Sequence, residues 1–227
     1  MAGRYTDLKW AGWLYLALAI IAPFSLSYVP SVIAEAGGTL AEKIAAHQQL
    51  LHLSMASEMF YQIIEVYIVL ALFQYFHSAS SNLARQMLVL GLLPLPIVFL
   101  NELNLIGAIS FATEGGVTAG LDTGFNESMS AMLYDFHGIG IVIASIFWGL
   151  WLIPLGRLVI ISDKIPKFFG YSVMVGAAGY IISAVATLIL PPLVAPVITE
   201  NLKFAGSLLM LGEVPIIAGL LWTAYKQ

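Results

Sequence analysis

The chain has 227 residues, of which 60% are hydrophobic and only 10% are charged. Soluble globular proteins carry about 25% charged residues, so this composition excludes a free cytosolic enzyme and indicates that lipid surrounds most of the surface. The net charge of −4 is too small and dispersed for a nucleic-acid partner, and the absence of cysteine excludes disulfides and thiolate-ligated metals.

Six apolar segments are long enough to cross a bilayer as helices, since a span needs about 20 residues. In chain order they are Trp10–Val32, Leu50–Phe76, Gln86–Phe111, Tyr134–Ile160, Lys167–Leu193 and Phe204–Tyr225. No alternating strand pattern competes with them. The sequence therefore predicts an all-α, polytopic integral membrane protein, with residues 1–227 forming a single bundle of six transmembrane helices.

The lysines and arginines set the expected orientation, because cytoplasmic segments are enriched in them. Lys43 and Lys203 fall on one side of the predicted bundle, and the remaining basic residues fall on the other. The larger group comprises Arg4, Lys9, Arg85, Arg157, Lys164, Lys167 and Lys226. We therefore expect a multi-pass protein of the cell (inner) membrane with both termini in the cytoplasm.

Two longer segments join spans on the outer side, Ile33–Gln49 and Ala112–Leu133. The first contains Thr39 and Glu42 at the spacing of a capping box, which predicts a short helix before the second span. The second is rich in glycine and holds three carboxylates, so we expect a flexible acidic loop. These carboxylates are Glu114, Asp122 and Glu127.

Local patterns in the fifth span concern packing rather than chemistry. Gly176, Gly179 and Ser183 lie on one side of this helix and predict a close-packing face. Pro191, Pro192 and Pro196 are interpreted as the end of the span.

Four glutamates lie inside predicted spans, where no lysine or arginine is deep enough to pair with them. They are Glu58, Glu65, Glu102 and Glu213. A carboxylate near the bilayer centre costs about 2.5–3.5 kcal/mol on insertion scales, so such residues are usually hydrogen-bonded, ion-bound or functional. A rise of about 1.5 Å per residue places Glu58, Glu102, Glu213 and His137 in the same outer half of the membrane. We therefore expect them to line one polar pocket.

Two segments extend this expected pocket. One polar stripe, which should face the bundle interior, runs into the second span through His47, Ser54, Glu58, Tyr61 or Gln62, and Glu65. The third span carries Asn101-Glu102-Leu103-Asn104 after two prolines. The complete predicted ligand-binding or proton-carrying set is Glu58, Tyr61, Glu65, Asn101, Glu102, Asn104, His137 and Glu213.

If the pocket holds a metal ion, the expected ligands are Glu58, Glu102, His137 and Glu213, because carboxylates and imidazole bind hard or borderline cations. The spacing permits a metal without requiring one. Phosphate loops, dinucleotide fingerprints and zinc-protease motifs are all absent, so no particular cofactor is indicated.

Several strings resemble those of a known family: Leu95-Pro-Ile-Val-Phe-Leu-Asn-Glu-Leu-Asn104, Asp135-Phe-His-Gly138 and Leu211-Gly-Glu213. Nearly the whole chain resembles the prokaryotic membrane family catalogued as domain of unknown function 4386. The resemblance implies a six-helix integral membrane protein and brings no settled activity.

Three interpretations of function follow from these residues. The first is a membrane protein that binds or transports a proton, a cation or a small polar or lipid-like ligand. The second is a membrane-embedded enzyme, metal-dependent or not, that acts on a lipid or quinone-like substrate with a carboxylate and His137 as acid and base. The third is a structural accessory subunit. The sequence lacks an internal repeat, which disfavours standard alternating access, and it lacks a convincing nucleophile, which disfavours covalent hydrolysis.

Overall fold

The computed structural model describes the backbone of residues 2–113 and 118–226 and the side chains of residues 8–113 and 118–226. Six helical segments in this part of the chain are long and apolar enough to cross a membrane, and no strand accompanies them. They are Leu8–Glu35, Gln48–Phe76, Ser81–Ala112, Thr123–Ser162, Lys167–Leu188 and Pro196–Lys226. The predicted all-α membrane architecture is therefore confirmed. Arg4 and Glu114, which entered the orientation and loop predictions, lie outside the described side chains.

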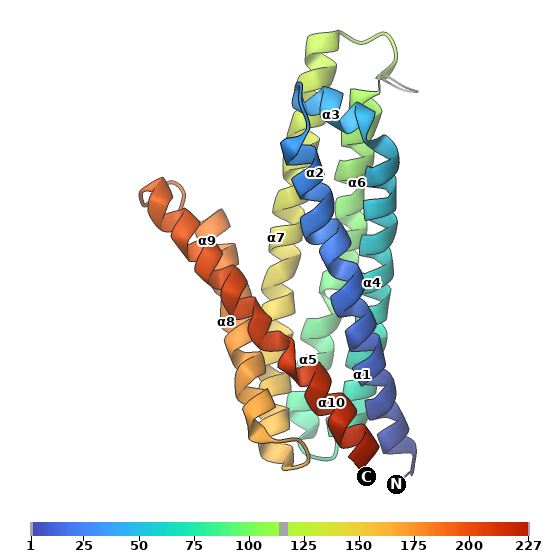
Figure 1. Ribbon diagram of the computed structural model, residues 1–227, viewed down its shortest axis with the longest axis vertical. Helices are drawn as coiled ribbons and strands as arrows, with labels where there is room; N and C mark the ends of the chain where they lie inside the picture. Colours follow the sequence, from blue (N-terminus) through green and yellow to red (C-terminus); the bar gives the residue numbers. More distant parts are fainter. Residues whose placement is uncertain (1, 114–117, 227) are drawn as a thin grey trace. The chain divides into compact units, whose positions relative to one another are not determined.

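The spans are built from the following helices, labelled in Figure 1 where space permits. In chain order they are α1 (Ala2–Pro23), η1 (Phe24–Tyr28), α2 (Val29–Glu35), α3 (Leu40–Ala46), α4 (Gln48–Phe76), α5 (Ser81–Leu92), α6 (Pro94–Ala112), α7 (Thr123–Ser162), α8 (Lys167–Leu188), α9 (Pro196–Met210), η3 (Leu211–Glu213) and α10 (Pro215–Lys226).

The chain divides into two compact units, each assembled from separate stretches of sequence. Unit 1 comprises Met1–Ala19, Ile63–Leu95 and Val142–Gln227, and unit 2 comprises Ile20–Gln62 and Pro96–Ile141. The boundaries fall inside α1, α4, α6 and α7. The single transmembrane domain stays a prediction.

Unit 2 has an apolar core contributed by α2, α3, α4 and α6. Its members are Val29, Ile33, Ile44, Leu51, Leu105, Ala108 and Ile109. The predicted capping box is confirmed at the start of α3: the Glu42 N–H donates to Thr39 Oγ1 at 3.2 Å, and the Thr39 N–H donates to Glu42 Oε2 at 2.7 Å. This cap satisfies two backbone donors that a helix start leaves free.

The first span contains a π-helical turn, η1, between α1 and α2. The Val29 N–H donates to the Phe24 carbonyl, one residue farther back than in an α-helix. Pro30, the second residue of α2, has no N–H and so cannot donate the hydrogen bond of a regular helix at that position. The wider turn holds Ser25, which is buried. Such π-turns are frequent at functional sites.

The predicted flexible loop at 112–133 is wrong for residues 123–133, which form the first turns of the 40-residue helix α7. Asp122 caps this helix, because its Oδ1 accepts the Phe125 N–H at 2.9 Å. Ser130 is buried and its Oγ donates to the Ala108 carbonyl at 2.8 Å. Helix α7 therefore begins at Thr123, before the apolar span that the sequence predicts from Tyr134.

In unit 1, α8 and α9 pack through glycines, as the small residues of the fifth span predict. A Cβ atom on Gly179 would lie 2.5 Å from the Met210 backbone nitrogen and 2.6 Å from the Gly206 carbonyl oxygen. The prediction that Pro196 helps to end the fifth span is wrong. Helix α8 ends at Leu188, and Pro196 instead begins α9, where its fixed φ suits the first turn.

Candidate functional site

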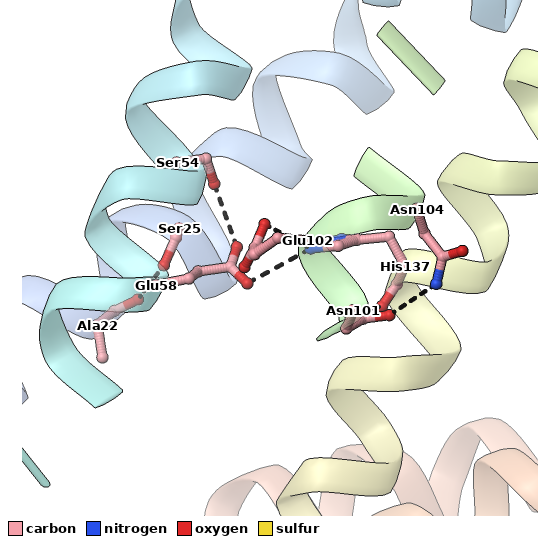
Figure 2. A network of polar contacts seen from close by, with 8 residues as sticks. All are labelled: Ala22, Ser25, Ser54, Glu58, Asn101, Glu102, Asn104 and His137. Carbon is pink, nitrogen blue, oxygen red and sulfur yellow. Dashed lines mark hydrogen bonds and ion pairs between the residues drawn. The ribbon is translucent and has the colours of Figure 1, made fainter. Parts of the chain in front are cut away.

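Three polar side chains converge inside unit 2 from three different helices. Glu58 comes from α4, Glu102 from α6 and His137 from α7, and all three point toward one another in Figure 2. His137 Nε2 lies 3.4 Å from Glu58 Oε2 and 3.7 Å from Glu102 Oε2. One ligand atom from each residue lies within 4.8 Å of the other two. We refer to Glu58, Glu102 and His137 as the carboxylate–histidine cluster.

The cluster is shielded from solvent and short of hydrogen bonds. Glu58 is 1% exposed, Glu102 is 3% exposed, and the His137 side chain is 11% exposed. Among the described residues, Glu58 Oε2, both Glu102 oxygens and His137 Nε2 have no hydrogen-bonding partner. Buried polar atoms are normally hydrogen-bonded, whereas the contacts between these three side chains are the two long ion pairs from His137 Nε2 at 3.4 and 3.7 Å.

Neighbouring polar groups hold the cluster in place. Ser54 Oγ donates to Glu58 Oε1 at 3.3 Å, and Asn101 Nδ2 donates to the His137 carbonyl at 2.9 Å. Asn104 Nδ2 in turn donates to Asn101 Oδ1 at 3.0 Å (Figure 2). Gly140 makes this possible, because a Cβ atom at that position would overlap the Asn101 amide. The absence of a side chain at Gly140 therefore allows α6 to fix the backbone that carries His137.

Unit 2 offers little positive charge to balance two buried carboxylates. Its sequence contains no arginine and one lysine, Lys43. The Lys43 ammonium donates to the Ala34 carbonyl at 3.2 Å and is part of the exposed end of the unit. Within the described residues of unit 2, the cluster therefore combines two acids and one imidazole with no lysine or arginine paired to them.

The other predicted site residues fall into two groups. Tyr61 lies buried on α4 in unit 2. The other members of the predicted polar stripe from Ser54 to Glu65 are buried as well, namely Ser54, Glu58, Gln62 and Glu65. Glu65 and Glu213 belong to unit 1. The shared pocket of Glu213 with the carboxylate–histidine cluster stays a prediction.

Glu213 has partners of its own within unit 1. The Tyr15 hydroxyl donates to Glu213 Oε1, and the Tyr180 hydroxyl donates to Oε2 at 2.9 Å. Glu65 also interacts electrostatically with Tyr15. Sequence reasoning missed both tyrosines, since a tyrosine in an apolar span resembles an ordinary interface aromatic. It also missed the buried Ser25, whose sequence signal was a serine between Pro23 and Pro30.

The fold and these residues define the class of protein: a helical membrane protein with a buried carboxylate–histidine cluster. The chain matches the family model described as Domain of unknown function (DUF4386) over residues 10–224, and it belongs to that family. No curated protein matches the chain, and no solved structure does.

Proposed function

We propose that the carboxylate–histidine cluster binds a divalent transition-metal ion, with zinc as the best fit, inside the helical bundle. The observation that carries this proposal is the convergence of three potential ligand atoms that lack hydrogen-bonding partners. The protein would then be a metal-binding integral membrane protein. The proton-carrying and polar-ligand interpretations account less well for three ligands at this spacing.

The interatomic distances support a tetrahedral ion. Zinc bound at about 2.0–2.2 Å holds its ligand atoms about 3.3–3.6 Å apart. The two separations from His137 Nε2, 3.4 and 3.7 Å, lie near that range and exceed ordinary N–H···O distances of about 2.7–3.2 Å. The remaining pair, one oxygen each from Glu58 and Glu102, lies within 4.8 Å.

The charges and ligand types support the same ion. Two carboxylates and a neutral imidazole carry a charge of −2, which a divalent cation balances. Imidazole selects against magnesium and calcium, whereas carboxylate oxygen and imidazole nitrogen together suit zinc. Ser54 donates to the Glu58 carboxylate and would orient it as outer-shell groups orient metal ligands, and Asn101 fixes the backbone that carries His137. Three protein ligands leave a fourth position open for water or an exchanging group, unlike a closed structural site.

Metal analysis of the purified protein tests the proposal. The full chain, without a polyhistidine tag, is loaded with zinc in detergent and desalted. The bound zinc is then measured by inductively coupled plasma mass spectrometry. We expect about one ion per chain in the wild type. Outer-shell changes weaken metal sites about 10–100-fold, so we expect Glu58→Gln, Glu102→Gln or His137→Gln to weaken binding at least about 100-fold.

Two exposed residues provide matched controls. Glu127→Gln removes an exposed carboxylate from α7, and His52→Gln removes an exposed imidazole from α4. Both controls should bind zinc like the wild type. The metal site is refuted if the wild type retains no zinc after loading at a saturating zinc concentration. It is also refuted if the ligand variants retain one zinc ion per chain.

The orientation inferred from the basic residues is part of this proposal, with both termini in the cytoplasm of an inner-membrane protein. The chain has no cysteine, so single introduced cysteines can be labelled without background. Gly37 and Ala79 are exposed in segments that link helices. We expect a membrane-impermeant maleimide to label Gly37→Cys in intact cells and Ala79→Cys only after permeabilisation. The reverse pattern would invert the orientation.

A further inference from the structure

A second polar site lies in unit 1, where the link between α7 and α8 meets the end of α10. A cavity of about 560 Å³ is lined there by Lys164, Lys167, Lys226, Asp163, Trp222 and Thr223, among others. Helix α10 packs directly on α8 at this point, because a Cβ atom on Gly219 would lie 2.8 Å from the Phe169 ring. The three lysines therefore gather at one place, although Lys226 lies about 60 positions beyond the other two in the sequence.

The cavity carries an excess of positive charge. Lys167 Nζ forms an ion pair with Asp163 Oδ1 at 3.1 Å. Lys164 Nζ instead lies 5.0 Å from the centroid of the Tyr75 ring, and Lys226 Nζ lies 5.3 Å from that of Trp222. Among the described residues, neither lysine has a carboxylate partner. Three lysines and one aspartate leave two positive charges for an anion.

The surroundings of the lysines are apolar, which indicates an amphiphilic ligand. Trp222 is 62% exposed, and Phe168, next to Lys167, is 67% exposed. Tryptophan and lysine together are typical of the boundary between headgroups and acyl chains. Basic pockets between transmembrane helices bind phosphate-bearing lipid headgroups. A soluble phosphate would use the lysines and leave the aromatic side chains without a role.

We propose that this lysine cavity binds the phosphate group of an anionic phospholipid. The headgroup occupies the space between Lys164, Lys167 and Lys226, and the acyl chains lie along the exposed aromatic side chains of α8 and α10. The site shares no residue with the carboxylate–histidine cluster and does not depend on the metal. It stabilises the packing of α8 against α10 by bridging the two helices through one ligand.

Titration of the full-length protein in detergent with two lipids of equal chain length tests the proposal. Native mass spectrometry measures the binding of phosphatidylglycerol and of phosphatidylcholine. We expect phosphatidylglycerol to bind at least about tenfold tighter, because two uncompensated charges each contribute about 1 kcal/mol, or about fivefold. The variant K164Q/K167Q/K226Q should lose this preference. The double variant K43Q/K203Q removes lysines elsewhere and should retain it.

A gain-of-binding variant separates the proposal from a general loss of structure. Asp163→Asn removes the carboxylate at the cavity and should tighten phosphatidylglycerol binding about fivefold. Asp163 has a φ of 51°, a left-handed conformation that asparagine also tolerates well. Equal binding of the two lipids, or unchanged binding in Asp163→Asn, would overturn the proposal. Displacement of the lipid by inorganic phosphate at millimolar concentration would also overturn it, in favour of a soluble phosphate.

Discussion

We expect saturating zinc to raise the thermal unfolding midpoint of the protein by about 8–16 °C and Glu102→Gln to abolish this rise. A ligand that binds only the folded state at 1,000 times its dissociation constant stabilises it by about 4 kcal/mol. For a chain of this size, 1 kcal/mol corresponds to about 2–4 °C. The five tryptophans provide a fluorescence signal for the measurement in detergent.

The same variant should have the opposite effect when zinc is absent. In the metal-free protein, Glu58 and Glu102 are two buried acids with only His137 between them. A glutamine in place of Glu102 removes one buried acid and can donate a hydrogen bond to the imidazole. We therefore expect Glu102→Gln to unfold at a higher temperature than the metal-free wild type, and at a lower temperature than the zinc-loaded wild type.

This reversal distinguishes a metal site from polar side chains that only join helices. If the cluster serves as structural glue, Glu102→Gln destabilises the protein equally with and without zinc. Glu127→Gln, on the exposed surface of α7, should follow the wild type under both conditions. If Glu102→Gln unfolds below the wild type by the same number of degrees with and without zinc, metal binding by this cluster is contradicted.

The fold was predictable because it depends on features that repeat along the chain. Long apolar segments predict six spans whatever their tertiary contacts, since lipid requires every backbone group to be paired within a helix. The stripe from Ser54 to Glu65 predicts the buried face of α4 for a similar reason, because helical periodicity places these residues together. Both predictions use only local spacing.

Helix ends were less predictable, because side-chain caps and prolines act over only a few residues. The glycines and carboxylates of 112–133 indicate a loop, yet Asp122 caps a helix that starts at Thr123. The turn at Phe24–Tyr28 had no sequence signal beyond the flanking Pro23 and Pro30. Likewise, Pro196 ends one span or begins the next according to where the neighbouring helix stops.

The candidate site was predictable in its chemistry and less so in its partners. Glu58 and Glu102 were predicted because they are carboxylates within spans that have no lysine or arginine to pair with them. His137 was added because its estimated depth in the membrane matches theirs. Depth carries no information about direction around a helix axis, however. It therefore could not assign Glu213 to its hydrogen bonds with Tyr15 and Tyr180. Those contacts depend on the rotation of α1, α8 and η3 within unit 1.

The packing of α8 on α9 provides the second large effect, because glycine is required there by backbone contact. We expect Gly179→Leu to prevent assembly of these helices and Gly179→Ala to cost about 3 kcal/mol, at the upper end for overpacking. The atoms that a Cβ would meet are the Met210 nitrogen and the Gly206 carbonyl oxygen, at 2.5 and 2.6 Å. Backbone atoms cannot rotate away as a side chain can, so the helices must separate.

Gly138 supplies the matched comparison, since it also lies within a long helix but has nothing within 4 Å of an added Cβ. Alanine is favoured over glycine in a helix by about 0.5–1 kcal/mol, so Gly138→Ala should raise the unfolding midpoint by about 1–4 °C. Gly179→Ala should lower it by about 6–12 °C. The two changes have identical chemistry, so opposite signs isolate the contact with α9. A Gly179→Ala variant as stable as Gly138→Ala would show that α8 and α9 do not pack this closely in the membrane.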